Sequence, residues 1–226
     1  MIRALARPLV AVNAAATTAL RAPARAASGS AANRNVRFSI TQVGSVMDPY
    51  VPPASMPTPL SKDGRAAWWS KFLNLAKSTM YVVQLRKDLP SFVANKFPLE
   101  AEQLYINMNK AFAIGRPTDV LPFVTDQMLS TLKGQMRKRP GTLEWEYLGA
   151  VDRPSTVAVR YAKQKGDPFG AAQVTVKIHS RQRLTVKDER GSVLATSESD
   201  PTEFIILERF TKSDGKWRIA GKVERT

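Results

Sequence analysis

The chain has 226 residues, of which 43% are hydrophobic and 23% charged, so it can build one folded domain with extensions and is not of disordered composition. Its formal net charge of +15 favours anionic partners such as nucleic acid or an anionic membrane surface. With no cysteine and one histidine, His179, it excludes disulfides, thiolate zinc sites and two-histidine sites within one chain, and we expect neither metal nor cofactor.

Residues 1–38 predict a mitochondrial transit peptide. They are rich in arginine, alanine and serine, and the first acidic residue of the chain is Asp48. Proline, asparagine and the arginines interrupt the compact apolar run of a secretory signal, and no run approaches the ~20 residues of a membrane span. The alternative is a disordered basic tail. We expect cleavage after Arg25 or after Arg37.

Residues 39–96 form a basic extension in this interpretation. The stretch 47–60, MDPYVPPASMPTPL, contains five prolines and predicts an extended linker. Residues 61–89 then predict a helix with two adjacent tryptophans among lysines. About two-thirds of the net positive charge lies before residue 99. We therefore expect this part of the chain to bind a partner.

The tryptophan pair is a candidate contact site. Trp68 and Trp69 beside Lys71 suit a membrane interface or stacking on RNA, because indole rings tolerate a half-wet environment. The alternative is a helix that docks onto the domain with one tryptophan in the core. We expect one of the two in the core and the other in contact with RNA or membrane.

Residues 97–226 predict the folded domain. Pro98 opens a helix that Gly115 closes, and Thr125 caps a second helix. After this helix, the spacing of apolar residues changes from the 3.6-residue period of a helix to the two-residue period of a strand. Arg153-Pro154 marks one of the turns between the expected strands. The expected strands are Leu143–Val151, Thr156–Ala162, Ala172–Lys187, Glu203–Thr211 and Trp217–Val223. Helices followed by consecutive antiparallel strands indicate an α+β fold, with the helices packed on one face of a curved sheet.

The pattern of helices and strands in this domain resembles that of a known mitochondrial family. The stretch PLEAEQLYINMNKAFAIGRPTDVLPFVTDQMLSTLK, the strand TLEWEYLGAV and the closing DGKWRIAG carry the resemblance, over about residues 97 to 225. The family comprises the carboxy-terminal domain of the inner-membrane translocase subunit that recruits the import motor, a large-subunit mitoribosomal protein and the fungal inner-membrane ribosome receptor. The resemblance implies a cone-shaped domain like that of nuclear transport factor. The chain looks most like the ribosomal and ribosome-receptor branch.

The strand patterns argue against catalysis. The residues on the expected inner faces include no titrating group: Trp145, Tyr147, Val157, Val159, Val174, Val176, Ile178, Phe204, Ile206, Trp217 and Ile219. Glu208 points to the same face of its strand as Phe204 and Ile206, but we expect it to be solvated at a strand end. His179 alternates with the apolar residues of its strand and therefore lies on the polar face. No catalytic residue is expected, and whether the inner face holds an apolar ligand stays open.

Two cationic groups remain as contact candidates. Lys133, Arg137, Lys138 and Arg139 gather at the end of the second helix, where they either stabilise the helix C-terminus or contact phosphates of RNA or lipid. The second group shares one strand face, which is either a docking surface or a solvated face: Lys177, His179, Arg181, Arg183 and Lys187. Arg160, Lys216, Arg218 and Lys222 share the outward parity of their own strands, and Glu144 and Glu146 reduce the positive charge.

The resemblance implies a non-enzymatic component of the mitochondrial large ribosomal subunit, or a ribosome receptor. It would dock the ribosome exit site at the matrix side of the inner membrane for mitochondrial translation and co-translational insertion. The implied partners are ribosomal RNA and neighbouring ribosomal proteins, the anionic inner-membrane surface and the membrane insertase. One alternative is a peripheral protein-import component. Another is a small-ligand-binding or isomerase-like cone domain.

Overall fold

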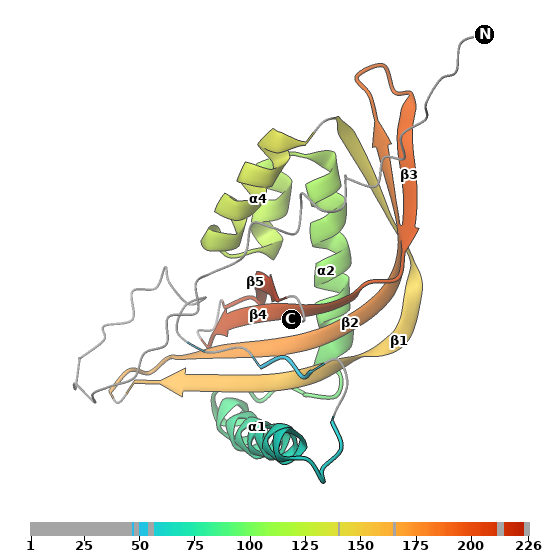
Figure 1. Cartoon of the computed structure of the whole chain (residues 1–226). Coiled ribbons are helices and arrows are strands. Elements are labelled where there is room, and N and C mark those ends of the chain that lie inside the picture. The colour runs from blue at the N-terminus through green and yellow to red at the C-terminus, as the bar shows by residue number, and fades with distance from the viewer. Residues whose placement is uncertain are drawn as a thin grey trace. The chain divides into compact units, whose positions relative to one another are not determined.

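The computed structural model describes residues 47, 50–53, 57–139, 141–164, 166–211 and 215–223, and the predicted transit peptide lies outside these residues. The helices precede the strands, so the fold is α+β as predicted (Figure 1). The helical elements are α1 (Lys62–Asp88), α2 (Phe97–Ile114), α3 (Pro117–Val120), the 3-10 turn η3 (Leu121–Phe123) and α4 (Asp126–Lys138). The strands are β1 (Thr142–Lys163), β2 (Gly170–Lys187), β3 (Val193–Ser199), β4 (Thr202–Phe210) and β5 (Arg218–Val223).

Local signals determine where the helices begin and end. The Ser61 hydroxyl accepts a hydrogen bond from the first turn of α1, and the Thr125 hydroxyl does the same for α4. Pro98 lies in the first turn of α2, where its missing N–H costs nothing. Gly115 ends α2 with φ +88°, a left-handed conformation that glycine adopts without strain. These helix boundaries confirm the predictions.

The strands form one antiparallel sheet in the order β1-β2-β4-β5, with β3 paired to the other half of β2. The predicted turn at Arg153-Pro154 is wrong, because β1 runs through it as a single strand of 22 residues. Its pairing with β2 is irregular at four places, one of them between Asp152 and Ser155. A proline has no N–H for the ladder and is tolerated at such a bulge. Bulges also bend a strand, and the sheet is curved (Figure 1).

The concave face of the sheet carries the core under α2. Val174 and Val176 of β2 lie opposite Leu207 and Ile205 of β4, and all four are buried. The prediction that Phe204 and Ile206 face this core is therefore wrong, because neighbouring residues of a strand point to opposite faces. Phe204 is nevertheless completely buried. Since apolar residues of β4 are covered on both faces, their alternation could not identify the concave side.

Helix α1 lies along the edge of β1 (Figure 1). The Asn74 side-chain amide donates to the carbonyl of Val157 at 3.0 Å, and the backbone N–H of Val159 donates to the Ser78 hydroxyl at 3.2 Å. These polar side chains satisfy backbone groups that an edge strand leaves unpaired. The helix face turned to the sheet is therefore partly polar, which leaves apolar residues elsewhere on α1.

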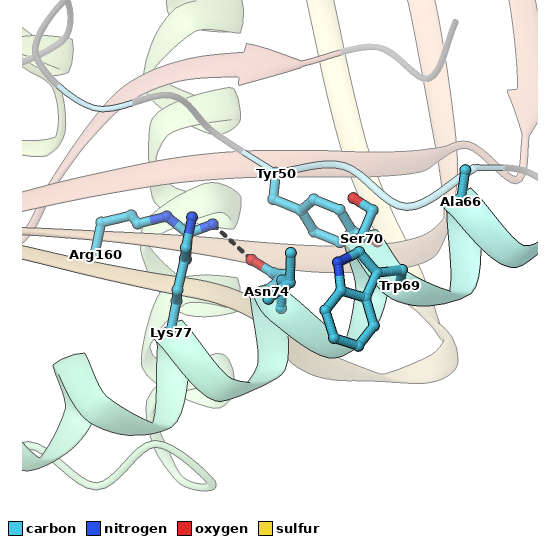
Figure 2. Close-up of a pocket in the computed structure, with 8 residues that line it drawn as sticks. Tyr50, Ala66, Trp69, Ser70, Asn74, Lys77 and Arg160 are labelled. Atoms are coloured by element: carbon cyan, nitrogen blue, oxygen red, sulfur yellow. Dashed lines mark hydrogen bonds between the residues drawn. The ribbon is translucent and has the colours of Figure 1, made fainter.

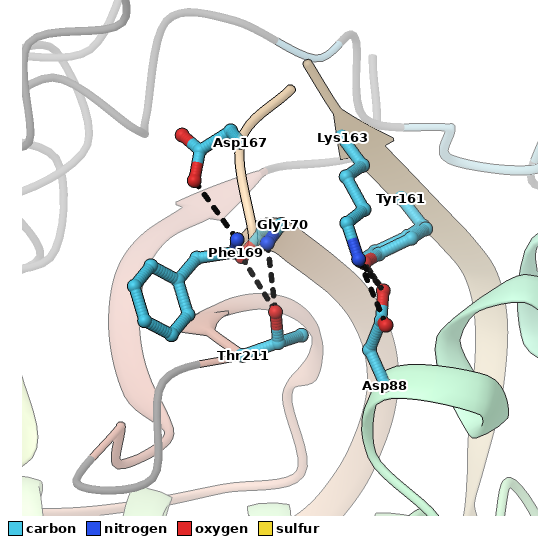
Figure 3. Close-up of polar contacts among 7 residues, drawn as sticks. All are labelled: Asp88, Tyr161, Lys163, Asp167, Phe169, Gly170 and Thr211. Atoms are coloured by element: carbon cyan, nitrogen blue, oxygen red, sulfur yellow. Dashed lines mark hydrogen bonds and ion pairs between the residues drawn. The ribbon is translucent and has the colours of Figure 1, made fainter. Parts of the chain in front are cut away.

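Hydrogen bonds join the last residue of α1 to the end of β1 (Figure 3). The Asp88 carboxylate accepts hydrogen bonds from the Tyr161 hydroxyl and, at 2.9 Å, from the Lys163 ammonium. A β-carbon at Gly170 would overlap the Tyr161 hydroxyl. The Gly170 N–H donates to the Thr211 hydroxyl at 2.7 Å, which holds this glycine in place. The glycine thus leaves room for the side chain that holds Asp88.

Candidate functional site

The outer face of α1 presents a row of exposed apolar side chains. We name it the α1 stripe, and its residues lie on one side of the helix and are 44 to 65% exposed: Trp68, Trp69, Phe72, Leu75, Met80 and Val83. The Trp69 and Phe72 rings stack with centroids 5.6 Å apart. A contiguous exposed apolar surface of this kind marks an interaction site in a soluble domain.

The expectation that one tryptophan enters the core is wrong. Trp68 is 44% exposed and Trp69 is 62% exposed. The reason is that the edge of β1 takes Asn74 and Ser78 from α1, so the tryptophans lie on other faces of the helix. Sequence reasoning also missed the rest of the stripe. Its helical spacing opposite Asn74 was the signal that could have found it.

Cations accompany the α1 stripe. The Lys71 ammonium lies 5.1 Å from the centroid of the Trp68 ring, a distance that allows a cation–π interaction. Lys62, Arg65 and Lys77 are exposed on the same helix. None of these cations forms an ion pair within the described part of the chain. Apolar side chains flanked by unpaired cations suit an anionic membrane surface.

The four cations at the end of α4 divide into two groups. Lys133, Arg137 and Lys138 are exposed on the helix, and we name them the α4 cluster. No described carboxylate pairs with any of them. Three unpaired cations within six residues form a surface suited to phosphate groups.

Arg139 has a different role. Its guanidinium donates to the carbonyls of Phe112 and Ala113, both at 3.1 Å, and so caps the end of α2. These carbonyls belong to the last turn of the helix, where backbone acceptors lack partners. For Arg139, capping of a helix end is therefore favoured over a phosphate contact. Its charge is used inside the domain, where it ties the end of α4 to α2.

The cationic residues of β2 share one face, as their spacing predicted, but carboxylates pair with them. Arg181 bonds Asp200 at 3.1 Å, and the Asp200 pKa is held below its ordinary value by that guanidinium. The Arg183 guanidinium bridges Glu146 and Glu198. The remaining pairs are Lys177 and His179 with Asp152, and Lys187 with Glu144. The interpretation as a solvated face is favoured, because the carboxylates neutralise the row locally.

Three further cations were expected to point outward because of their positions in their strands, and the structure agrees for some of them only. Arg218 is exposed, as expected from its parity. Arg160 donates from its guanidinium to Asn74 of α1 at 2.6 Å. Lys222 was expected to face outward, but an irregularity in the β4–β5 pairing places it opposite Ile205 on the concave face. There its ammonium pairs with the Glu203 carboxylate.

The concave face also holds a polar network that contradicts the expectation of no titrating group there. The Tyr105 hydroxyl donates to Glu203, and the Gln182 amide donates to the Tyr105 oxygen at 2.6 Å. The Trp145 indole donates to the Gln182 carbonyl oxygen at 2.9 Å. Burial, and then the charge of Glu203, raises the pKa of Tyr105, so this tyrosine stays a neutral donor. Tyr147 similarly donates to Glu102. The groups satisfy one another, which favours a structural network.

Glu208 is buried, which corrects its expected solvation at a strand end. Its side chain lies in the sheet opposite Gln173, and the two residues are 3% and 2% exposed. No described group donates a hydrogen bond to either carboxylate oxygen. Burial raises the pKa of Glu208 to about 7, because desolvation disfavours the charged form. Among the described residues, no group of three or more His, Asp or Glu side chains is arranged to hold a metal ion.

Comparison with known proteins identifies similar chains. A family model described as "MBA1-like protein" matches residues 29–226. The "Large ribosomal subunit protein mL45" of Xenopus tropicalis is 28% identical over 193 residues, which cover 82% of this chain and 61% of the relative. The mL45 protein of Drosophila melanogaster is 26% identical over 192 residues, covering 82% and 53%. The "Inner membrane mitoribosome receptor MBA1, mitochondrial" of Saccharomyces cerevisiae is 28% identical over 118 residues, covering 51% and 42%.

The chain spans less than two thirds of the length of the mL45 relatives it matches. The matches support the ribosomal and ribosome-receptor branch of the family that the sequence resembles, and they give no support to the translocase motor branch.

Proposed function

Because the chain belongs to the MBA1-like protein family, we propose that it is a mitochondrial protein that docks the large ribosomal subunit at the inner membrane. The names of its relatives describe a ribosomal protein and a ribosome receptor, which implies a structural role without catalysis. Docking at the exit site would serve mitochondrial translation and co-translational insertion.

The observation that carries the proposal is the contrast between two cationic surfaces. Carboxylates from neighbouring strands neutralise the cationic row of β2, whereas Lys133, Arg137 and Lys138 of the α4 cluster have no described ionic partner. Phosphate contacts by lysine and arginine supply most of the non-specific affinity for nucleic acid. We therefore assign the α4 cluster to ribosomal RNA.

A separate surface suits the membrane. The α1 stripe combines two tryptophans with exposed apolar side chains, and Lys71 lies beside it. Tryptophan side chains are enriched at membrane–water interfaces, and nearby lysines add roughly 1 kcal/mol each on an anionic surface. No helix in the described part of the chain has the length and apolar character needed to span a bilayer. We therefore propose peripheral attachment through α1.

We propose that the protein lies on the matrix side of the inner membrane. Attachment there brings the ribosome exit site to the membrane into which nascent chains are inserted. The membrane insertase is for this reason an expected neighbour of the docked complex. The basic extension of residues 39–96 would add contacts to RNA or to neighbouring ribosomal proteins, in part through its tryptophan-containing helix α1.

Two binding experiments test the proposal. The first sediments the full chain with purified mitochondrial large ribosomal subunits at low and at high salt. Changing Lys133, Arg137 and Lys138 to glutamine should abolish co-sedimentation at moderate salt. The matched control changes Lys177, Arg181 and Arg183 to glutamine, which removes the same formal charge from the paired face. Equal losses in both variants would mean that net charge, and not the α4 cluster, controls binding.

The second experiment floats the chain with vesicles that contain anionic phospholipid. Replacing Trp69 and Phe72 with serine should remove vesicle binding and leave ribosome binding intact. Vesicle binding without any ribosome binding would instead support a peripheral import component. A soluble chain that binds neither and turns over a small carbonyl compound would support the isomerase-like alternative.

A further inference from the structure

A hollow of about 330 Å³ opens between α1 and the outer side of the sheet (Figure 2). Ala66, Trp69 and Leu73 form its wall along α1, three or four residues apart, and Tyr50 lines it from the preceding segment. Lys77 lies at the other end of the part of α1 that lines the hollow. From residue 66 to residue 77 the helix rises by about 16 Å, at 1.5 Å per residue. The hollow is thus long and has one apolar wall.

One end of the hollow is cationic. Figure 2 shows the Lys77 and Arg160 side chains near each other, away from Ala66. The Arg160 guanidinium is held in place by Asn74, at 2.6 Å, and by Ser78, at 3.2 Å. Lys77 is exposed, and no carboxylate in the described ranges pairs with it. A hollow with one apolar wall and a positive end matches an amphiphile that carries an anionic head.

The dimensions of the hollow fit one acyl chain of a phospholipid. The hydrocarbon core of a bilayer is ~30 Å thick, so the acyl chains of one leaflet span about 15 Å. This length matches the distance from Ala66 to Lys77, and the volume lies at the lower end of the range of small-molecule sites. Trp69 also belongs to the α1 stripe, so the hollow borders the surface assigned to the membrane.

We infer that this hollow binds one acyl chain of an anionic phospholipid, with the lipid phosphate beside Lys77. The inference rests on the proposed membrane attachment and adds a defined lipid site to it. The chain of the lipid lies against Ala66, Trp69 and Leu73, where it replaces water on apolar surface. The phosphate gains a contact with the Lys77 ammonium and lies in the field of Arg160.

Titration with dodecyl phosphate below its micelle concentration tests the site, using the full chain and isothermal calorimetry. The expected result is saturable binding of one molecule per chain. Ala66→Trp fills the hollow and should abolish this binding, whereas Ala76→Trp, on an exposed part of the same helix, should not. Lys77→Gln should weaken binding about fivefold, the effect of one lysine at an anionic surface, and Lys62→Gln should leave it unchanged.

Vesicle flotation separates this inference from the proposed function. Ala66→Trp should still float with anionic vesicles, because the α1 stripe remains. Vesicle binding by the unchanged chain without saturable dodecyl phosphate binding would overturn the lipid site and leave membrane attachment standing. A chain that binds no vesicle would overturn both. Displacement of dodecyl phosphate by a short single-stranded RNA, with loss of that RNA in Ala66→Trp, would show that the hollow takes a nucleotide instead.

Discussion

The guanidinium of Arg139 occupies the space in which a β-carbon at Gly115 would stand. Gly115 ends α2 in the left-handed conformation, and Arg139 follows α4, so one contact joins the ends of two helices. The same guanidinium caps the carbonyls of Phe112 and Ala113. This relationship positions the end of α4, and with it the exposed cations on that helix.

Gly115→Ala should lower the free energy of unfolding by about 3 kcal/mol. A left-handed residue with a β-carbon costs roughly 1–2 kcal/mol, and displacing Arg139 removes hydrogen bonds worth ~1 kcal/mol each. Urea unfolding followed by circular dichroism measures the change. Gly134→Ala is the matched control: no atom lies within 4 Å of its added carbon, so it should stabilise α4 by about 1 kcal/mol. Equal destabilisation in both variants would contradict the prediction.

Arg137 and Arg139 should differ in the salt dependence of RNA binding. Arg137→Gln should reduce the slope of log affinity against log salt by about 1, because one phosphate contact is lost. Arg139→Gln should leave the slope unchanged, since its guanidinium contacts α2 carbonyls. Filter binding of a ribosomal RNA fragment at several salt concentrations measures both slopes. A reduced slope in Arg139→Gln would return Arg139 to the contact surface.

Glu208→Gln should stabilise the protein above pH 7. Burial raises the folded-state pKa of Glu208 from 4.5 to about 7, so the folded state binds this proton more tightly than the unfolded state. The resulting stability is fully present below pH 4.5 and is lost as the pH rises through 7. At pH 8 the glutamine variant should be more stable than the unchanged chain by about 2–3 kcal/mol, and at pH 4.5 the two should be similar.

Urea unfolding at these two pH values provides the measurement. Glu198→Gln is the control, because Glu198 is exposed and pairs with Arg183. It should give no stabilisation at pH 8. If Glu208→Gln destabilises the protein at pH 8, its carboxylate has a partner in the folded state.

Tyr161→Phe should loosen α1 from the sheet. The Tyr161 hydroxyl donates to Asp88 at the end of α1, and a hydrogen bond of this kind contributes about 1 kcal/mol. Proteolysis within α1, measured by limited digestion and mass spectrometry, should be about fivefold faster. Tyr81→Phe removes a hydroxyl from α1 that forms no described hydrogen bond and should digest at the unchanged rate. Identical rates in all three chains would mean that the Tyr161–Asp88 hydrogen bond does not hold the helix.

Sequence patterns predicted the helices well and the sheet in part. Ser61, Thr125 and Gly115 act within one turn of chain, so the helix boundaries followed from local chemistry. Strand β3, Val193–Ser199, was missed because every residue in it is exposed and no alternation of apolar residues marks it. The continuity of β1 through Pro154 was missed because bulges form only when a partner strand is present.

The candidate contact residues divide in the same way. Lys133, Arg137 and Lys138 are exposed, as their helical spacing predicted, and they stay candidate contacts. The hydrogen bonds from Arg139 to α2 could not be predicted, because its acceptors lie 26 and 27 residues away. The tryptophans were misplaced because only the edge of β1 determines which face of α1 must be polar.

The sequence by itself determined that Lys177, His179, Arg181, Arg183 and Lys187 share one face, because side chains two apart on a strand point the same way. Only the tertiary structure decided that this face carries little unpaired charge. Its carboxylates come from β1, from β3 and from Asp200, up to 43 residues away along the chain, and they meet the cations through strand register. Spacing within a strand is local geometry, whereas charge pairing depends on which strands lie side by side.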